Sequence, residues 1–512
     1  MNLFEASILV VYFGTLAALS AYGLHRCWLL YLYFKNRGNG ISEPNLQLRE
    51  WKDEELPAIT VQLPIFNERY VVERLIDSAC RLDYPKDRLE IQVLDDSTDD
   101  TTETAERAIH YWKNRGINIY LLHRTDRTGY KAGALKAGLA ATKSPFIAIL
   151  DADFLPSPDF LKKVMAGFIN DRIGVVQARW GHLNRHYSWL TRAQSILLDG
   201  HFVIEHTARN RSGRFFNFNG TAGAWRRECL EDAGGWEHDT LTEDLDLSYR
   251  AQLKGWKFIY LPEIVVPAEL PSEIHGFKSQ QHRWAKGSVQ TAIKLGARIV
   301  AAPVSLKLKL ESLAHLGANI CYPLLLLMSL LLWPALYLRT HSLDPGSGVL
   351  FDAALFGSAS ISIIIFYLAA QHEVDHKYWW LRVFDLPIVF ALGIGLAVNN
   401  TTAVLEACIG YETPFVRTPK HAITGNSGTW RGKSYFNRKS VSSLVEIAMG
   451  AYLCATVWYT ITEQLYLATA FVSLFAFGYL YIGVVSLAQS VLRSFGPRLK
   501  TSVETTIPVA VS

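Results

Sequence analysis

The apolar residues of this chain fall into two kinds of pattern, and the first kind is long enough to cross a membrane. Residues 6–24 carry no charge, and the apolar character resumes after His25 and Arg26 as far as Phe34. About 20 apolar residues suffice for a helix that spans a bilayer. Basic residues follow the run and no small-residue cleavage site stands out after it, so residues 1–37 are predicted to be an uncleaved anchor.

The second kind of pattern begins after a polar linker, 38–56, and covers residues 57–300. Short β-rich runs alternate there with charged segments of helical periodicity. Such alternation is typical of an α/β domain with a mainly parallel sheet, whose ligands bind at the carboxyl ends of strands. Two acidic clusters, 95–100 and 151–153, fall at such ends. Strands are predicted at 58–63, 89–94, 117–122 and 146–150, and helices at 68–82, 101–115 and 131–141.

Apolar runs return in the C-terminal region, 301–500, which a tail, 501–512, follows. Candidate spans lie at 313–338, 350–370, 444–462 and 465–488, with a shorter run at 386–398. Basic residues lie in the loop 409–440 and after the last apolar run, so both segments are expected on the cytoplasmic side with the domain. They are Arg417, Lys420, Arg431, Lys433, Arg438 and Lys439 in the loop, and Arg493, Arg498 and Lys500 after the run. An even number of crossings must then separate the domain from the loop. The run 386–398 is too short to cross and is taken as re-entrant or interfacial, which gives five spans.

Composition narrows the class of protein further. A net charge of +4 without a basic tract gives no sign of nucleic-acid binding, and the six Cys show no C-x-x-C spacing typical of a zinc site. The hydrophobic content of 50% is unevenly spread, as expected of a protein with a membrane part and a soluble part. We therefore expect a multi-pass protein of a bacterial inner membrane, a plasma membrane or a Golgi membrane, in contact with lipid and without a nucleic-acid partner.

The stretch from Leu241 to Trp284 offers three chemistries that a sugar-transfer site needs. Asp244, in T-E-D, is a carboxylate that can deprotonate a hydroxyl, and Arg283 is a cation for a departing diphosphate. Trp284 has an aromatic face that can hold a sugar ring. Taken alone, T-E-D is also ordinary chemistry for the start of a helix. The acidic strand ends that precede it favour the catalytic interpretation.

The acidic strand ends fit a nucleotide diphosphate and its cation. Asp151 and Asp153 stand two apart and supply the hard oxygen ligands that Mg²⁺ or Mn²⁺ requires, although D-x-D is a common tripeptide. Asp95 and Asp96 can accept hydrogen bonds from a base or ribose, while the residues after them can also cap a helix. Lys131, between small residues, can reach a phosphate or can be a solvated helix residue.

Six motifs follow one another in a fixed order along about 220 residues. They are P-I-F-N-E (64–68), D-D-S-T-D (95–99), K-A-G (131–133), D-A-D (151–153), T-E-D (242–244) and Q-Q-H-R-W (280–284). These motifs and their order resemble those of membrane-bound family 2 glycosyltransferases of the cellulose synthase and cellulose synthase-like type. The run from Glu68 to Thr101 is similar to the plant mannan and xyloglucan-backbone synthase-like branch and its bacterial relatives.

The resemblance implies a fold, a reaction and a set of site residues. The fold would be α/β, a cytoplasmic GT-A domain inserted between transmembrane helices, and the enzyme an inverting, metal-dependent hexosyltransferase. It would move a hexose from UDP-glucose or GDP-mannose to a growing β-glycan, with Asp244 as general base and Mg²⁺ or Mn²⁺ on Asp153, or on Asp151 as the second candidate. The implied donor residues are Glu68, Asp95, Asp96, Lys131, Asp151, Asp153, Gln280 and Arg283; the acceptor residues are Asn219, Gly220, Thr221, Glu243 and Trp284; and Phe415, Thr418 and Lys420 belong to a gating-like loop.

Two departures from the family pattern and two rival functions stay open. The acceptor-side loop lacks the Cys usual in cellulose synthases, and Arg417 stands where those enzymes often have Val. A glycolipid synthase would use the same chemistry on a lipid acceptor. A transporter or receptor with a degenerate nucleotide-binding domain would leave the intact Asp151, Asp153 and Asp244 without a purpose.

Overall fold

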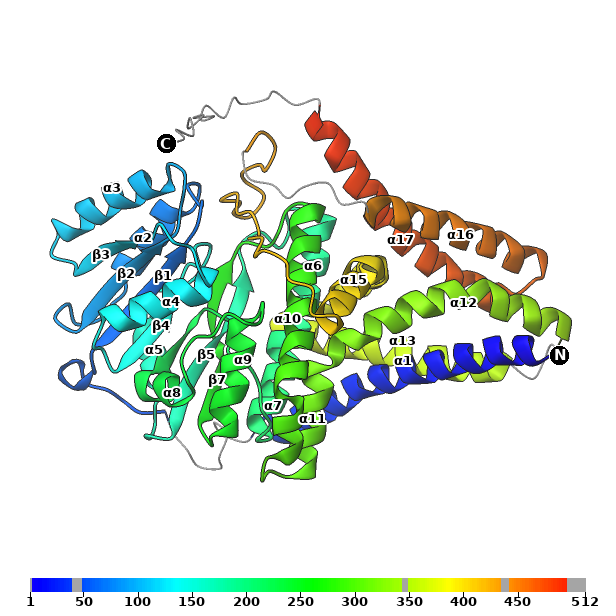
Figure 1. Cartoon of the computed structure of the whole chain (residues 1–512), viewed down its shortest axis with the longest axis horizontal. Helices are drawn as coiled ribbons and strands as arrows, with labels where there is room; N and C mark the ends of the chain where they lie inside the picture. The colour runs from blue at the N-terminus through cyan, green and yellow to red at the C-terminus, as the bar shows by residue number, and fades with distance from the viewer. Residues whose placement is uncertain (1, 39–47, 343–348, 434–441, 495–512) are drawn as a thin grey trace, which may run out of the picture.

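The structure, a computed structural model, describes residues 2–38, 48–342, 349–433 and 442–494. Figure 1 shows a domain built on one sheet beside an elongated bundle of long helices. The first helix, α1 (Leu3–Asn36), packs in this bundle against α12 (Cys321–Ser342) and α13 (Val349–Val374). The chain therefore leaves the bundle after α1, forms the domain, and returns to the bundle.

In the described residues, seven strands form the sheet, in the order β3-β2-β1-β4-β6-β5-β7. β6 is antiparallel to both of its neighbours, and the other pairs are parallel. The predicted α/β class is confirmed, while the antiparallel strand was not foreseen. The strands are β1 (Ile59–Ile65), β2 (Leu89–Asp95), β3 (Ile119–His123), β4 (Phe146–Ile149), β5 (Ile173–His182), β6 (Gly223–Arg226) and β7 (Lys257–Ala268).

Helices cover the sheet and extend from it toward the bundle. Those of the domain are α2 (Val72–Cys80), α3 (Thr101–Lys113), α4 (Tyr130–Ala141), α5 (Phe160–Met165), α6 (Trp189–Asp199), the π-helix η2 (Gly200–His206), α7 (Thr207–Arg211), α8 (Arg227–Asp232), α9 (Glu243–Leu253) and α10 (Ile274–Ala301). After them come α11 (Leu306–Leu316), η3 (Ala318–Ile320), η4 (Trp379–Asp385), α14 (Leu386–Gly395), α15 (Ala397–Cys408), α16 (Ser442–Thr462) and α17 (Tyr466–Ser494), and a short 3₁₀ turn, η1 (Asp53–Glu55), precedes β1.

The central strands are mostly apolar and almost wholly buried because helices cover both faces of the sheet. The buried polar side chains of Gln62 in β1 and Gln92 in β2 hydrogen-bond to each other at 3.0 Å. On one face, Ile59, Val61 and Leu63 of β1 pack in a core with Leu75 and Ile76 of α2. On the other face, residues of β4 and β6 pack with those of α4 and α9. This double burial fixes the strand register, so the ends of β1 and β2 coincide where Ile65 faces Asp95.

The bundle holds helices that are long and apolar enough to cross a membrane. By length and composition, the described residues contain five candidates: Leu3–Asn36, Ala318–His341, Trp379–Cys408, Ser442–Thr462 and Tyr466–Leu492. The predicted runs at 6–24, 313–338, 444–462 and 465–488 overlap four of these. The predicted run at 350–370 lies in α13, a helix of 26 residues that is not among the five. The basic residues Arg438, Lys439, Arg498 and Lys500 lie outside the described residues.

The segment 386–398 is longer in the structure than the sequence pattern indicates. It is the centre of a helical stretch, Trp379–Cys408, that reaches the length of a span, so the argument from shortness alone is wrong. The stretch is broken into η4, α14 and α15, and about half of its apolar window is buried against protein. Its α14 packs on α6 and α17, and its α15 packs on α10. The stretch thus lies between the domain and the bundle.

Candidate active site

A cavity of about 180 Å³ lies at the carboxyl ends of β1, β4 and β7 and beside the start of α9. Residues far apart in the sequence line it together, including almost all of the predicted site residues. Those that line it are Glu68, Asp96, Lys131, Asp151, Asp153, Asn219, Gly220, Glu243, Asp244, Gln280, Arg283, Trp284, Phe415, Thr418 and Lys420.

Two predicted residues, Asp95 and Thr221, are not part of the cavity wall. Asp95 accepts hydrogen bonds from the backbone N–H of Ser97 at 2.9 Å and from the Thr102 hydroxyl at 2.6 Å, and its Oδ2 lies 2.8 Å from His123 Nδ1. The Thr221 hydroxyl accepts a hydrogen bond from the backbone N–H of Asp151 at 2.8 Å. Both side chains therefore support their neighbours, and direct ligand contact by either stays a prediction.

The three aspartates of the donor side each pair with a cation from another part of the chain. Lys131 Nζ lies 2.6 Å from Asp151 Oδ1, and Lys420 Nζ lies 2.6 Å from Asp153 Oδ2. Arg124 donates to both carboxylate oxygens of Asp96, from Nε at 2.8 Å and from Nη2 at 2.6 Å. This bidentate geometry is typical of strong carboxylate recognition. These contacts hold all three carboxylates in place at the strand ends.

Glu68 is the fourth carboxylate of this edge and is held differently. Burial raises the pKa of its carboxyl group to about 8, although Arg417 opposes the shift. Glu68 Oε1 and Arg417 Nη1 are 3.6 Å apart, which is too long for a strong hydrogen bond. The effect of burial on the pKa of Glu68 therefore exceeds that of Arg417, and a further cation beside Glu68 would favour the charged form of its carboxyl group.

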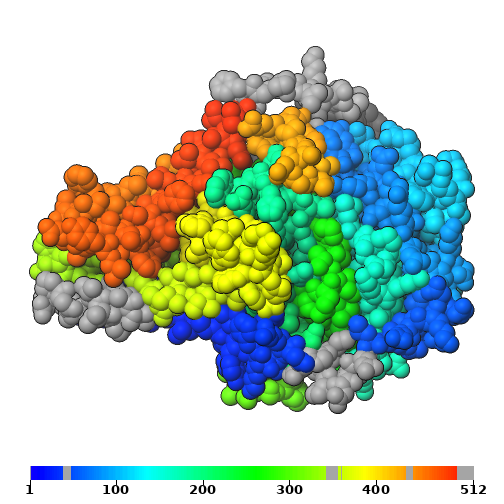
Figure 2. Space-filling view, turned by 180° about the vertical axis from the view of Figure 1, so that it is seen from behind, coloured from blue at the N-terminus to red at the C-terminus, as the bar shows by residue number. Residues whose placement is uncertain are grey.

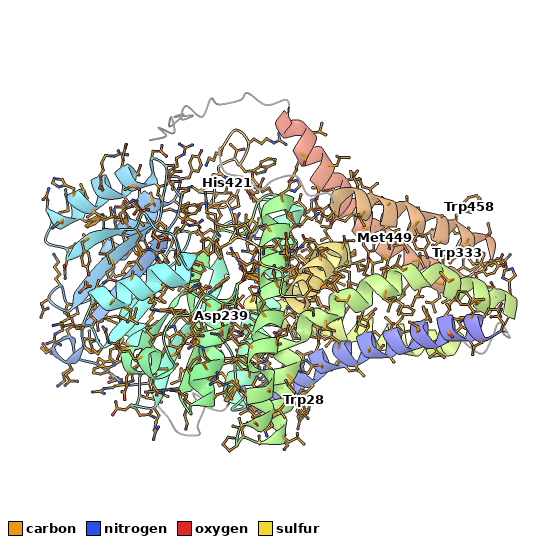
Figure 3. The ribbon with its side chains drawn as sticks, in the orientation of Figure 1. Trp28, Asp239, Trp333, His421, Met449 and Trp458 are labelled. Carbon is orange, nitrogen blue, oxygen red and sulfur yellow. The ribbon has the colours of Figure 1, made fainter. Side chains whose placement is uncertain are left out.

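The loop that follows α15 closes one side of the cavity. The ring of Phe415 stacks on Tyr130 at 5.7 Å, and Arg283 lies over the same Phe415 ring at 4.5 Å while donating to the Val416 carbonyl at 3.2 Å. Beyond it, the backbone N–H of His421 donates to Glu269 at 2.8 Å. Figure 3 places His421 beside the domain, and Figure 2 shows the loop (orange) lying against the N-terminal part of the domain (blue).

Asp244 stands at the first turn of α9 without an ion pair in the described part of the chain. Its Oδ1 accepts from the backbone N–H of Leu245 at 2.8 Å. Burial raises the pKa of its carboxyl group to about 7, and neighbouring Glu243 adds to the shift while Lys131 opposes it. A carboxyl group with that pKa can accept a proton near neutral pH.

Gly220 lies beside Asp244. It adopts φ +76°, a left-handed conformation that favours glycine, and a Cβ added there would lie 3.0 Å from Asp244 Oδ2 and 3.3 Å from Lys131 Nζ. Asp244 Oδ2 therefore lies close to the backbone of Gly220, where any side chain would crowd the carboxylate.

Trp284 and Arg283 lie side by side on α10, across the cavity from the strand ends. Trp284 also approaches Trp180 of β5, with ring centroids 6.5 Å apart. Burial lowers the pKa of the Arg283 guanidinium, while Glu243, Asp151 and Asp244 raise it, so its charge is balanced by the acidic wall. The helix thus presents a cation and an aromatic face to the same space.

Several wall residues were missed from the sequence. The wall residue Arg127, which lies over the Phe66 ring at 3.3 Å, and Arg124, which holds Asp96 from behind the wall, follow the third predicted strand directly. Their place after a strand end was a usable signal. Trp180 and Glu269 were not identifiable in this way, because β5 and β7, whose ends carry them, were not predicted.

A separate acidic cluster lies away from the cavity, on α9 and the loop before it. Glu237, Asp239 and Asp246 bring carboxylate oxygens within 4.8 Å of one another, and Figure 3 labels Asp239. Lys294 Nζ sits among them, at 2.6, 2.7 and 3.1 Å. Lys294 and Arg250, which lies 2.8 Å from Asp246 and 3.5 Å from Glu237, together offset most of the cluster's charge, so the cluster ties α10 to α9.

The mixed sheet, the acidic strand ends and the flanking apolar helices together define a GT-A-like glycosyltransferase fold. More specifically, residues 57–287 match the family described as "Glycosyltransferase like family 2", so the chain carries a glycosyltransferase family 2 domain. The predicted resemblance is confirmed for this domain.

The relatives agree with the family assignment. Glucomannan 4-beta-mannosyltransferase 2 of Arabidopsis thaliana is 46% identical over 258 residues, 48% of this chain and 48% of the relative. Probable glucomannan 4-beta-mannosyltransferase 3 of Oryza sativa subsp. japonica is 46% identical over 249 residues, 48% of this chain and 45% of the relative. The chain thus matches about half the length of these curated relatives.

One solved structure has a similar fold. It is the mannosyltransferase PcManGT from Pyrobaculum calidifontis in complex with GDP-Man and Mn²⁺. The alignment has a TM-score of 0.54 and 20% identity, and it covers 79% of this chain and 100% of that one. At this level of identity the likeness concerns the fold.

Proposed function

We propose that this protein is an inverting hexosyltransferase that moves mannose from GDP-mannose to a growing β-glycan at the membrane. The observation that carries the proposal is Asp244, a partly buried carboxylate with a raised pKa that shares one cavity with Arg283, Trp284 and the acidic strand ends. The 46% identity to glucomannan 4-beta-mannosyltransferases favours mannose over glucose, and UDP-glucose is the competing donor.

The chemistry needs one base. The acceptor hydroxyl attacks the anomeric carbon while Asp244 Oδ2 takes its proton, and the bond from that carbon to the diphosphate breaks with its electron pair on the leaving oxygen. Because the attack comes from the face opposite the leaving group, the configuration inverts. Arg283 and Lys131 supply positive charge where the nucleoside diphosphate gains its negative charge.

The acidic strand ends also suit a divalent cation. Asp153 Oδ2 accepts from Lys420 Nζ at 2.6 Å and from the backbone N–H of Glu269 at 3.1 Å, so this oxygen already attracts a cation. Carboxylate oxygens are the donors that Mg²⁺ and Mn²⁺ prefer. When bound by Asp153 and Asp151, such a cation supplies charge that stabilises the departing diphosphate.

The gating-like loop provides an argument for topology. Arg417, Lys420 and Thr424 contact Glu68, Asp153 and Arg74 of the domain, so the loop and the domain share one side of the membrane. An even number of crossings then separates them, which α12 and α13 supply if the stretch 379–408 is interfacial. Basic residues in this loop assign that side to the cytoplasm.

This topology predicts which thiols react from outside the cell. In a background with Cys408 and Cys454 replaced by Ser, Ser427→Cys should resist an impermeant thiol reagent in intact cells, because Ser427 lies in the loop. Gln464→Cys, in the turn between α16 and α17, should react, because one crossing separates it from the loop. Labelling of Ser427→Cys from outside would refute the shared side.

The direct test of the proposed function is donor selection. The purified protein is incubated with radiolabelled GDP-mannose, UDP-glucose and other UDP- and GDP-sugars, and the product is sized and digested with linkage-specific glycosidases. A β-mannan polymer from GDP-mannose is the expected result. A short product that extracts into organic solvent would instead identify a glycolipid synthase, and no transfer from any donor would refute the activity.

A further inference from the structure

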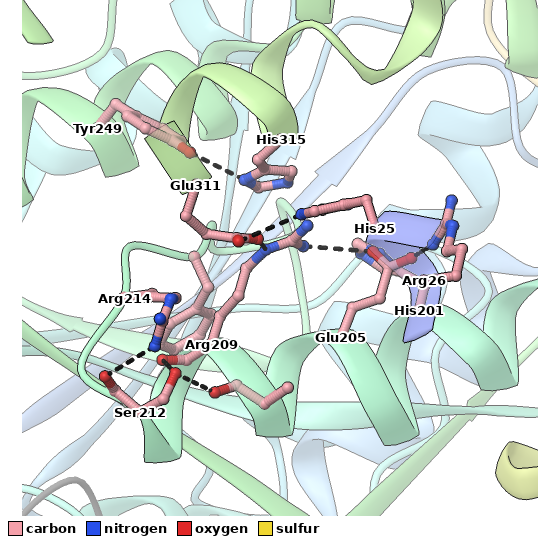
Figure 4. A network of polar contacts seen from close by, with 12 residues as sticks. His25, Arg26, His201, Glu205, Arg209, Ser212, Arg214, Tyr249, Glu311 and His315 are labelled. Atoms are coloured by element: carbon pink, nitrogen blue, oxygen red, sulfur yellow. Dashed lines mark hydrogen bonds and ion pairs between the residues drawn. The ribbon is translucent and has the colours of Figure 1, made fainter. Parts of the chain in front are cut away.

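A buried series of ion pairs connects the first membrane helix with the acceptor side of the site (Figure 4). Arg26 of α1 pairs with Glu205 of η2, and Arg209 bridges Glu205 Oε2 and Glu311 Oε1 at 3.2 Å each. His25 of α1 completes the series by approaching Glu311 Oε2 at 3.2 Å. Figure 4 shows Arg26 and His25 directed from α1 toward these carboxylates.

This series of ion pairs borders a second cavity, of about 330 Å³, on the membrane side of the candidate active site. Asp244 and Trp284 belong to the walls of both this cavity and the first, as does Asn219. Arg26, His201 and Glu205 also line the second cavity. A chain of sugars whose reacting end lies at Asp244 can therefore extend into a second space, and the wall of that space includes Arg26 of α1.

Glu205 determines which atoms donate and which accept in the hydrogen bonds around Asn219. Glu205 Oε2, a carboxylate oxygen, can only accept, so His201 Nδ1, 3.1 Å away, must carry the proton. Burial lowers the pKa of His201 well below its usual range, and neighbouring His206, Arg209 and Arg26 lower it further, so the ring is neutral. Its other nitrogen, Nε2, is then an acceptor.

The acceptor nitrogen of His201 determines how the amide of Asn219 is turned. His201 Nε2 lies 3.3 Å from Asn219 Nδ2, which donates, and this places Asn219 Oδ1 against His206 Nε2 at 2.6 Å. The reversed amide would set oxygen against an acceptor nitrogen at His201. The Glu205 carboxylate thus determines the tautomer of His201. That tautomer in turn determines the orientation of the Asn219 amide, and Asn219 lines both cavities.

The backbone under this arrangement is unusual. His201, Glu205 and His206 all lie on η2, a π-helix of seven residues that continues α6. π-helical turns are rare and occur frequently at functional sites, because the extra residue per turn redirects side chains. Here the π-turn places His201 and Glu205 at the second cavity and His206 behind Asn219.

We propose that Arg26, Glu205 and His201 are positioning residues that hold Asn219 in one amide orientation for the acceptor glycan, so the first membrane helix is part of the acceptor site. Arg26 acts by neutralising Glu205 and holding it against His201. The occupant is a β-linked glycan with hydroxyl groups along its length, and this identification rests on the proposed function.

Two variants and one matched control test the proposal. Arg26→Gln removes one of the two arginine charges that hold Glu205, the other being Arg209. Glu205→Gln puts an amide NH₂ among three neighbours, Arg26, Arg209 and His201, that all donate. The control is Glu373→Gln, which breaks another link of α1, the pair between Arg37 and Glu373 at 3.4 Å, away from the second cavity. Arg26→Lys keeps the charge and should recover most of the lost effect.

The kinetic readout separates positioning from general damage. With labelled GDP-mannose and a β-1,4-mannohexaose acceptor, Arg26→Gln and Glu205→Gln should raise the acceptor KM about tenfold, the cost of one misplaced hydrogen bond. The donor KM and kcat should stay within about threefold, because neither residue touches the donor side. The double variant should be no worse than the poorer single one, since both act through one contact.

A second readout does not depend on activity. Hydrogen–deuterium exchange of peptides covering residues 215–222 should accelerate in both variants and stay unchanged in Glu373→Gln. Unchanged exchange and acceptor KM in Arg26→Gln and Glu205→Gln would overturn the proposal, as would an equal loss in Glu373→Gln. If exchange accelerates while the wild type transfers no sugar, the positioning role stands and the proposed function fails.

Discussion

The two walls of the candidate active site use carboxylates in opposite ways. On the donor wall, Asp96, Asp151 and Asp153 are each within 2.8 Å of an Arg or Lys nitrogen. On the acceptor wall, Asp244 has no such partner among the described residues, and burial raises its pKa to about 7. The paired carboxylates hold their cations beside the donor space, whereas Asp244, unpaired and with a raised pKa, is ready to take a proton.

The difference between the two walls assigns donor binding to one wall and the chemical step to the other. Lys131 and Lys420 come from α4 and from the loop after α15, so the donor wall is assembled from distant segments that a bound diphosphate can rearrange. Asp244 is held by its own helix, through the backbone N–H of Leu245 and the packing of α9. Changes on the donor wall should therefore affect binding and turnover together, and changes at Asp244 should affect turnover alone.

The largest effect is expected from Asp244→Asn. The amide cannot accept the acceptor proton, so kcat should fall by about a thousandfold, within the range for loss of a general base. The affinity for GDP should stay within about threefold, because the base contributes little to holding the donor. Radiolabel incorporation and calorimetric titration with GDP give the two numbers. Near-normal turnover would remove Asp244 from the mechanism.

A smaller but broader loss is expected from Asp153→Ala. The variant removes an oxygen ligand and leaves Lys420 without its partner, so donor affinity and kcat should both fall, by about tenfold each. Turnover of the wild type should also require added Mg²⁺ or Mn²⁺. Full activity in excess chelator would refute the metal role. An effect on kcat alone would contradict the expectation that changes on the donor wall affect binding and turnover together.

The sequence predicted the donor wall better than the acceptor wall. Asp151 and Asp153 follow a short, wholly apolar strand, so local pattern was enough to place them at the end of a sheet. The contact of Lys420 with Asp153 joins positions 267 residues apart, and it was suggested only by resemblance to a gating loop. No local pattern could show that a loop after α15 would reach β4.

The acceptor wall depends on features without a sequence signal. β6 has four residues and runs antiparallel between β4 and β5, yet it fixes Gly220 and Thr221 beside Asp151. The π-helix η2 looks like a continuation of α6 in the sequence. The series of ion pairs from Arg26 to Glu311 unites positions that only the packing of α1 brings together.

The smallest effect among the variants is expected from Trp284→Ala. Loss of one aromatic sugar contact, worth about 1 kcal/mol, should slow synthesis and shorten the product by about a few-fold, because a loosely held chain leaves sooner. Product sizing by gel filtration measures this, with donor affinity as the internal control. An unchanged chain length would show that Trp284 does not hold the glycan between additions.

The most direct test of the division between the walls is the pH dependence of kcat, measured together with that of GDP affinity. Asp244 must be deprotonated to act, so with its pKa near 7 we expect kcat to level off above about pH 8 and to fall by about tenfold per unit below pH 6. GDP affinity should lack this fall below pH 6, because Asp244 contributes little to holding the donor. A kcat that is constant from pH 8 to pH 5, or a fall that appears in GDP affinity instead, would contradict the account.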